Sequence, residues 1–148
     1  IVFVAVGGGG LVAGVGAVLK SHNPAIRIVG CQPAASAVMM RSVEAGEILE
    51  LPSEPTLSDG TAGGIEPDAI TFALNQAVVD DWVEVDEEQI ASAMRRYMDS
   101  GNDVIEGAAG VALAGMLERA ADVAGKKVVV IICGGNVSDE VLSRVRQN

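Results

Sequence analysis

Short apolar runs and segments of helical periodicity alternate along the whole chain. The apolar runs predict buried strands over residues 1–6, 26–32, 82–85 and 127–132. The intervening segments predict helices over residues 11–20, 35–45, 68–79, 87–100, 107–115 and 137–146. Strands that alternate with helices are typical of an α/β fold. We therefore expect three layers, with a mostly parallel sheet between two layers of helices.

Four consecutive glycines, Gly7–Gly10, separate the first predicted strand from the first predicted helix. Because this loop has no side chains, its backbone N–H groups are open to a ligand, and the positive end of the helix dipole adds to them. Such an arrangement is typical of a phosphate site. The alternative is a tight turn without a ligand, although one or two glycines are enough for a turn.

A second glycine turn, Cys133–Asn136 (CGGN), follows the last predicted strand. Parallel strands end at one edge of their sheet, and ligands of open α/β sheets bind in the crevice at that edge. We therefore expect both glycine turns to face one cavity. The irregular segment 47–64 contains two prolines and the turn Ser58–Gly60, and loops of this length often cover a site.

Most charged positions are predicted to have structural roles. Asp86 precedes a helical segment and is expected to be its N-cap. The acid pairs at 80–81 and 87–88 are expected to be solvated or capping charges. Lys20 and His22 lie at the end of the first predicted helix, where cations are favoured, so neither is assigned to catalysis.

Charge and composition exclude several classes of protein. The 148 residues carry a net charge of −10 and only 3% of them are aromatic, so the chain lacks the basic surface and stacking rings of a nucleic-acid-binding protein. No apolar run approaches the roughly 20 residues that span a membrane. Cys31 and Cys133 lack metal-motif spacing and indicate a reduced, cytoplasmic setting. We therefore expect no metal site, no nucleic acid and no membrane partner.

A dinucleotide site is an alternative at the glycine loop. Gly8, Gly10 and Ala13 fit the G-x-G-x-x-A pattern, which is weak without an acid at the end of the second strand to bind the ribose. That strand ends in Cys31–Pro33 (CQP) and has no such acid. An NAD-dependent oxidoreductase and a non-catalytic domain that binds a phosphorylated ligand are the alternatives to the family considered next.

Four motifs occur in order, at residues 6–14 (VGGGGLVAG), 56–60 (TLSDG), 104–110 (VIEGAAG) and 133–137 (CGGNV). Together they resemble the C-terminal part of the threonine/serine dehydratase and serine racemase family, whose members use pyridoxal 5'-phosphate. The resemblance covers essentially the whole chain. It implies the tryptophan synthase β-like fold, also called fold type II.

The resemblance implies a cofactor site built from these motifs. Glu106 would lie near the cofactor ring as the candidate catalytic residue, Gly60 would line the other side of the cofactor, and Cys133 would lie beside the pyridine nitrogen. From the residues alone, these three could instead be a helix N-terminal acid, a turn glycine and a small buried hydrophobe. The backbone N–H groups that would bind the phosphate belong to Gly7, Gly8, Gly9, Gly10 and Leu11.

The resemblance also implies an activity, the removal of water and then ammonia from threonine or serine to give a 2-oxo acid. Serine racemase and 3-hydroxyaspartate dehydratase are close variants. In this family a lysine of the N-terminal half forms a Schiff base with the cofactor, and no matching stretch occurs here. We therefore expect residues 1–148 to be the C-terminal, phosphate-binding portion of a longer polypeptide, inactive alone. Its expected partners are that N-terminal part, an amino-acid substrate and the second subunit of a homodimer.

Racemase-like members of the family also bind a divalent cation through an acid after the second strand and another acid six residues on. Gln32 and Val38 occupy these two positions here. The resemblance therefore does not extend to the cation site.

Overall fold

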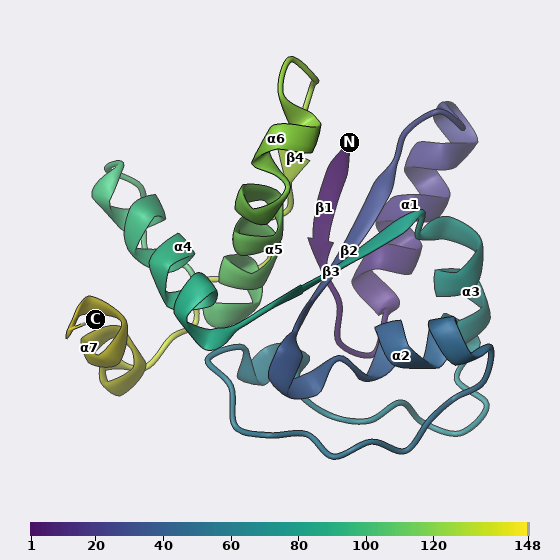
Figure 1. Cartoon of the computed structure of the whole chain (residues 1–148), viewed down its shortest axis with the longest axis horizontal. Coiled ribbons are helices and arrows are strands. Elements are labelled where there is room, and N and C mark those ends of the chain that lie inside the picture. Colours follow the sequence, from purple (N-terminus) through teal and green to yellow (C-terminus); the bar gives the residue numbers. More distant parts are fainter. Residues whose placement is uncertain (148) are drawn as a thin grey trace.

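The computed structural model describes residues 1–147, and Figure 1 shows a twisted sheet with helices on both sides. The strands are β1 (Val2–Ala5), β2 (Ile28–Pro33), β3 (Asp81–Val85) and β4 (Val129–Val130). All neighbouring pairs are parallel, and the order across the sheet is β3-β2-β1-β4. The predicted parallel sheet is therefore confirmed, and β1 lies in its interior.

Helices cover both faces of the sheet, which confirms the expected three-layer α/β architecture. They are α1 (Gly10–His22), α2 (Val38–Ala45), α3 (Ile70–Val78), α4 (Glu87–Asp99), α5 (Gly107–Glu118), α6 (Ala120–Val123) and α7 (Asp139–Gln147). On one face α1 packs against β1 and β2, and α3 packs against α1 and α2. On the other face α5 contacts all four strands, and α4 packs against α5 and α7. Within residues 1–147, none of these helices is long and apolar enough to cross a membrane.

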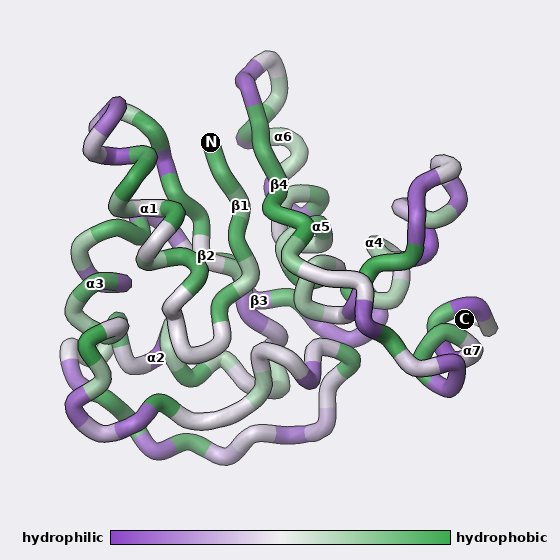
Figure 2. The backbone as a smooth tube through the Cα atoms, turned by 180° about the vertical axis from the view of Figure 1, so that it is seen from behind, coloured by the Kyte–Doolittle hydropathy of each residue, from purple (hydrophilic) through white to green (hydrophobic). Residues whose placement is uncertain are grey.

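Alternation along β1 explains why this strand is apolar at every position. Val2, Val4 and Val6 pack into the core on the α1 side of the sheet, whereas Phe3 and Ala5 pack into the core on the α5 side. Figure 2 shows the resulting hydrophobic track through β1. A strand that is buried on both faces needs apolar residues at successive positions rather than at every second one.

Small residues let α5 lie close to both the sheet and α4. A Cβ atom at Gly115 would lie 2.5 Å from Sγ of Cys31 in β2, and one at Gly110 would lie 2.8 Å from Cγ of Met94 in α4. Burial raises the pKa of the Cys31 thiol to about 12, so this cysteine stays protonated in the core. The close packing fixes the position of the N-terminal end of α5, which borders the candidate site.

Several element boundaries differ from those predicted, and three of them have a clear structural reason. The helix expected from residue 35 begins at Val38, because Ala34–Ser36 form a 3-10 turn. The helix expected from residue 68 begins at Ile70, because Asp68 has a φ of 60°, a left-handed conformation that no right-handed helix contains. The strand expected over 127–132 has two residues, and it pairs with a neighbour on one side only.

Polar contacts at the other end of the sheet correct one further expectation. Lys20 lies near the end of α1 as predicted, and its Nζ lies 2.7 Å from each carboxylate oxygen of Asp80. The N–H of Ile28 also donates to Asp80, over 2.7 Å. Asp80 is thus not a merely solvated charge, because it joins the end of α1 to the start of β2. Asp86 caps α4 as expected, in a reciprocal capping box with Gln89.

Candidate functional site

The four positions after β1 require glycine for two different reasons. Gly9 has a φ of 83°, and a Cβ atom there would lie 2.2 Å from Nδ2 of Asn75. A Cβ atom at Gly7 would lie 3.0 Å from Cα of Thr61. The fold itself therefore explains the glycines at positions 7 and 9.

Nothing in the fold explains the other two glycines. A Cβ atom at Gly8 or at Gly10 would have no described neighbour within 4 Å, and neither residue has a positive φ. Both residues instead line a cavity of about 410 Å³. Their missing side chains leave that cavity open where the backbone faces it, so an external group can approach the backbone closely.

The backbone at this wall offers a set of free hydrogen-bond donors. Within residues 1–147, no N–H group of residues 7–12 donates a hydrogen bond, and the first helical bond runs from Ala13 to the carbonyl of Gly9, over 3.0 Å. The first turn of α1 has neither an acidic residue nor a side-chain cap. Free N–H groups and the positive end of a helix dipole together favour an anion such as a phosphate.

The cavity gathers the residues predicted from the sequence and adds four others. The predicted residues in its lining are Gly7, Gly8, Gly9, Gly10, Leu11, Gly60, Glu106 and Cys133. Those that the sequence analysis missed are Ala5, Thr61, Thr71 and Ala108. The two glycine turns therefore face one cavity, as expected from the edge of a parallel sheet. Whether these residues bind a cofactor remains a prediction.

Glu106 lies between the two turns, directly before α5. Its Oε2 accepts a hydrogen bond from the N–H of Asn136 over 3.2 Å, and a Cβ atom at Gly134 would lie 2.4 Å from its Cδ. Glu106 occupies the N-cap position of α5, yet its carboxylate makes no capping bond to that helix. It also lines a second cavity of about 260 Å³ together with Asp59 and Ser138. The carboxylate is thus packed against the CGGN turn and lines both cavities.

Cys133 has an exposed side chain at the mouth of the cavity. Partial desolvation of its thiol raises its pKa, and the nearby Glu106 carboxylate raises it further. The thiol is therefore protonated and uncharged at neutral pH. It can donate or accept a weak hydrogen bond there, but it supplies no negative charge.

A buried amide holds the glycine loop in place. Asn75 of α3 is fully buried, and its Nδ2 donates to the carbonyls of Gly9, over 3.1 Å, and of Thr71, over 2.7 Å. Sequence reasoning did not single out Asn75. The sequence carried no clear signal for it, because Thr71 and Gln76 of the same helix are also polar and no local pattern marks Asn75 as the buried one.

A carboxylate holds the opposite wall. Glu87 at the start of α4 accepts hydrogen bonds from the hydroxyl of Thr56, over 2.6 Å, and from the N–H of Leu57, over 2.7 Å. A Cβ atom at Gly107 would lie 1.9 Å from the carbonyl oxygen of Leu57, so the loop also lies against the start of α5. The expectation that Glu87 is a solvated or capping charge is thus wrong, because its carboxylate binds Thr56 and Leu57. The side chain fixes the TLSDG segment that carries Gly60.

Gln32 ties the end of β1 to α2. Its Nε2 donates to the carbonyls of Val6, over 3.0 Å, and of Ser36, over 3.4 Å, while its Oε1 accepts from the N–H of Met40 over 2.7 Å. This buried side chain therefore has partners for both ends of its amide.

Within residues 1–147, no three His, Cys, Asp or Glu side chains cluster in a way that could bind a metal ion.

The sequence matches one protein-family model and several curated proteins. Residues 1–134 match the family model described as pyridoxal-phosphate dependent enzyme. The chain is 39% identical to the L-threonine ammonia-lyase of Thermotoga maritima, over 98% of the chain and 36% of that protein. It is 38% identical to the catabolic L-threonine dehydratase TdcB of Escherichia coli K12, over 99% of the chain and 44% of that protein.

Solved structures agree with these sequence matches. The processed form of threonine deaminase isoform 2 from Solanum lycopersicum matches with a TM-score of 0.91 and 32% identity, over 99% of this chain and 43% of that one. Maize serine racemase matches with a TM-score of 0.86 and 32% identity, over 99% and 46%. The chain thus has the fold of these enzymes but spans less than half the length of each of these four relatives.

Proposed function

Because the chain belongs to the family of pyridoxal-phosphate dependent enzymes, we propose that it supplies the cofactor-phosphate site of a longer ammonia-lyase. That enzyme removes water and then ammonia from threonine or serine and releases a 2-oxo acid. The names of the relatives support this choice, since several are threonine ammonia-lyases or dehydratases. The observation that carries it is the cavity in front of Gly8 and Gly10, with its free N–H donors.

The residues present fit a bound phosphate ester. Residues Gly7 to Leu11 line a cavity that two glycines leave open, and their N–H groups are free to donate to a ligand. No carboxylate lies in the first turn of α1 to repel a dianion. Asn75 holds the carbonyl of Gly9 and thereby keeps this loop in its conformation before a ligand arrives. A preorganised donor set of this kind binds phosphate without a rearrangement of the backbone.

The opposite side of the cavity suits an aromatic heterocycle. When bound, pyridoxal 5'-phosphate supplies an electron-accepting ring conjugated to the nitrogen of the substrate. Cys133 presents a neutral thiol, which would lie beside the ring nitrogen without bringing a formal charge to it. Glu106 presents a carboxylate whose position is fixed by Asn136, and we assign it the role of positioning the ring.

The reactive lysine of this enzyme belongs to the part of the polypeptide outside residues 1–148. Lys20 is paired with Asp80 at the opposite end of α1 from the glycine loop, and neither Lys126 nor Lys127 lines the cavity. The chain alone is therefore expected to be inactive, since no lysine amine reaches the site to react with the cofactor aldehyde.

The proposal is tested on the polypeptide encoded by the native gene. Purified protein is incubated with threonine or serine, and 2-oxo acid, ammonia and D-serine are measured. Release of 2-oxo acid and ammonia supports the ammonia-lyase, whereas D-serine as the main product identifies a racemase. Stabilisation of the fold by NAD but not by pyridoxal 5'-phosphate in thermal melts would instead favour the oxidoreductase alternative.

A further inference from the structure

Two buried polar side chains lie behind the glycine-loop cavity without lining it. Gln32 is near the end of β2, and Ser36 is the last residue of the 3-10 turn that follows. Each is 1% exposed. Because a buried polar group is costly unless it is hydrogen-bonded, the partners of these two residues show which segments they hold. We call them the Gln32–Ser36 pair.

The first segment held by the pair is the start of the glycine loop. Val6 lies directly before Gly7, and its carbonyl accepts a hydrogen bond from Nε2 of Gln32 over 3.0 Å. The N–H of Val6 donates to the carbonyl of Cys31 over 2.9 Å. Both backbone polar groups of Val6 are therefore bonded to β2 residues. The residue from which the glycine loop departs is thus fixed on the side away from the cavity.

The second segment is the start of α2. The N-cap residue of this helix is Ala37, whose side chain cannot cap. Oε1 of Gln32 accepts instead from the N–H of Met40, in the first turn, over 2.7 Å. An amide suits this place because one end donates and the other accepts, whereas a carboxylate could not donate to the carbonyl of Val6.

The third segment belongs to the opposite wall of the cavity. Oγ of Ser36 accepts from the N–H of Gly63 over 3.1 Å and from the hydroxyl of Ser53 over 2.8 Å. Gly63 lies two residues after Thr61, which lines the cavity. A Cβ atom at Gly7 would lie 3.0 Å from Cα of Thr61, so the two walls touch at this point. The Gln32–Ser36 pair thus holds the chain on both sides of that contact.

We propose that Gln32 and Ser36 are positioning residues of the phosphate site, which together set the spacing between the glycine loop and the segment 60–63. Neither side chain lines the cavity, so both act through the backbone of Val6 and Gly63. Nε2 of Gln32 also donates to the carbonyl of Ser36, over 3.4 Å, which joins the two residues into one network. N–H donors bind an anion tightly only where the surrounding structure holds them in place. This proposal rests on the proposed function, because it concerns how the same site is held.

Ligand binding by variants of the native full-length protein, freed of cofactor, tests the proposal. Gln32→Met replaces the amide by an apolar side chain of similar length. Ser36→Ala removes only the hydroxyl and is the milder variant. The control is Val83→Ala, since Val83 is buried in the core on the α5 side of the sheet. Calorimetry gives the affinity of each protein for pyridoxal 5'-phosphate and for pyridoxal.

We expect Q32M to reduce the preference for the phosphorylated ligand by about tenfold, the lower end of what outer hydrogen-bond partners contribute to binding of an ion. S36A should reduce it less, because the bond to Val6 remains. V83A should keep the wild-type preference even where it lowers stability, since a general loss of stability weakens both ligands alike. Q32M with the wild-type preference would overturn this proposal and leave the proposed function standing. Wild type that binds both ligands equally would overturn the proposed function and this proposal with it.

Hydrogen exchange without ligand tests whether the two residues act together. The N–H of Gly63 is bonded to Ser36 and not to Gln32. If the pair is one network, Q32M should nevertheless make exchange at Gly63 several-fold faster, because loss of one member loosens the segment that the other holds. V83A should leave exchange at Gly63 unchanged. Equal protection of Gly63 in Q32M and wild type would show that the two residues act separately and would overturn the proposal.

Discussion

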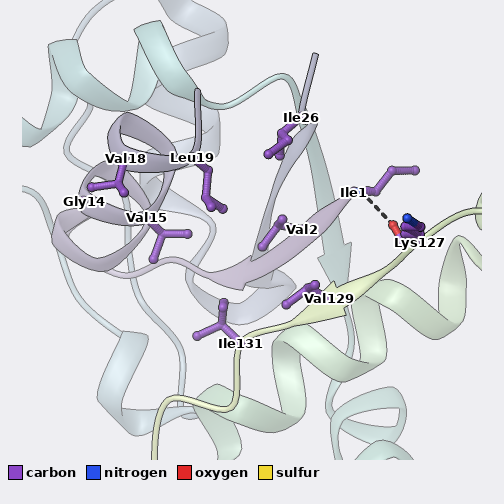
Figure 3. A pocket seen from close by; sticks show the side chains of 10 residues that line it. All are labelled: Ile1, Val2, Gly14, Val15, Val18, Leu19, Ile26, Lys127, Val129 and Ile131. Atoms are coloured by element: carbon purple, nitrogen blue, oxygen red, sulfur yellow. Dashed lines mark hydrogen bonds between the residues drawn. The ribbon is translucent and has the colours of Figure 1, made fainter. Parts of the chain in front are cut away.

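The two openings beside α1 differ in what the helix offers to each. At its N-terminal end, α1 presents backbone N–H groups and no side chain that fills the space. Along its side, where Figure 3 shows an apolar groove, the same helix presents Val15, Val18 and Leu19 and no polar group. A helix has free polar groups only at its ends. The end of one helix can therefore bind a small anion, whereas its flank offers only apolar contacts.

The two openings also differ in how their walls are held. Around the glycine-loop cavity, polar side chains and close backbone contacts fix each wall, through Asn75, Glu87 and Gly107. Few polar contacts hold the apolar groove along the side of α1, whose lining includes Val15, Val18 and Val129; one of them is the bond from Lys20 to the carbonyl of Ile26. Substitutions at the cavity should therefore change ligand binding more than substitutions in this groove.

The largest expected effect follows from Gly107→Ala. The added Cβ atom would overlap the carbonyl oxygen of Leu57, and backbone cannot move aside as a side chain does. We expect a loss of about 3 kcal/mol in the free energy of unfolding, measured by urea denaturation. Gly64→Ala is the control, because its Cβ atom would meet no described atom within 4 Å. A G107A protein as stable as G64A would show that the cavity wall does not depend on this contact.

Asn75→Ala should have the next largest effect. It leaves the carbonyl of Gly9 without its amide partner and opens a small void, so we expect a loss of about 2 kcal/mol in stability. Affinity of the full-length protein for pyridoxal 5'-phosphate should fall as well. Asn102→Ala, at an exposed position, serves as control. If N75A bound the cofactor as tightly as N102A, the amide would not position the loop.

Two variants, Glu87→Gln and Glu88→Gln, compare two adjacent acids of α4. The neutral amide cannot accept both bonds from the 56–57 segment, and we expect a loss of about 1 kcal/mol in stability, measured by thermal unfolding. Glu88→Gln affects only an exposed ion pair with Arg95 and should cost less than about 0.5 kcal/mol. Equal losses in the two variants would mean that Glu87 acts only on the helix dipole.

Glu106→Gln should give the smallest effect, and it acts on a reaction rate. The Glu106 carboxylate raises the pKa of Cys133, so its removal lowers that pKa and increases the thiolate fraction at pH 8. We expect alkylation of Cys133 by iodoacetamide to become about two- to fivefold faster. Cys31 does not interfere because its thiol is buried. Glu66→Gln, at an exposed acid, is the control. If Cys133 were alkylated no faster in E106Q than in E66Q, the Glu106 carboxylate would not influence the pKa of the Cys133 thiol.

Most of the fold and most of the residues that line the cavity could be predicted from the sequence. Continuous apolar runs predicted the parallel sheet, and glycine turns after two strands predicted which edge carries the site. The edge could be predicted without the strand order, because parallel strands end at one shared edge of the sheet whatever their order. The presence of Gly60 and Glu106 at that edge came from the family resemblance rather than from periodicity.

What the sequence could not provide is the network that spans distant segments. Glu87 contacts Thr56 across 31 positions, and Asn75 contacts Gly9 across 66. Local patterns show a capping acid and a polar residue in a helix, and nothing in them identifies the partner. The strand over 127–132 was predicted, but not that β4 is only two residues long, because its length depends on a neighbouring strand rather than on its own residues.

The most direct test of the phosphate site compares two ligands in two proteins. Binding of pyridoxal 5'-phosphate and of pyridoxal, which lacks the phosphate, is measured by calorimetry for full-length wild type and Gly8→Val. The account predicts that wild type prefers the phosphorylated ligand by about 100-fold, and that G8V loses most of this preference while its affinity for pyridoxal changes little. An unchanged preference in G8V would contradict the claim that the glycine loop binds the phosphate.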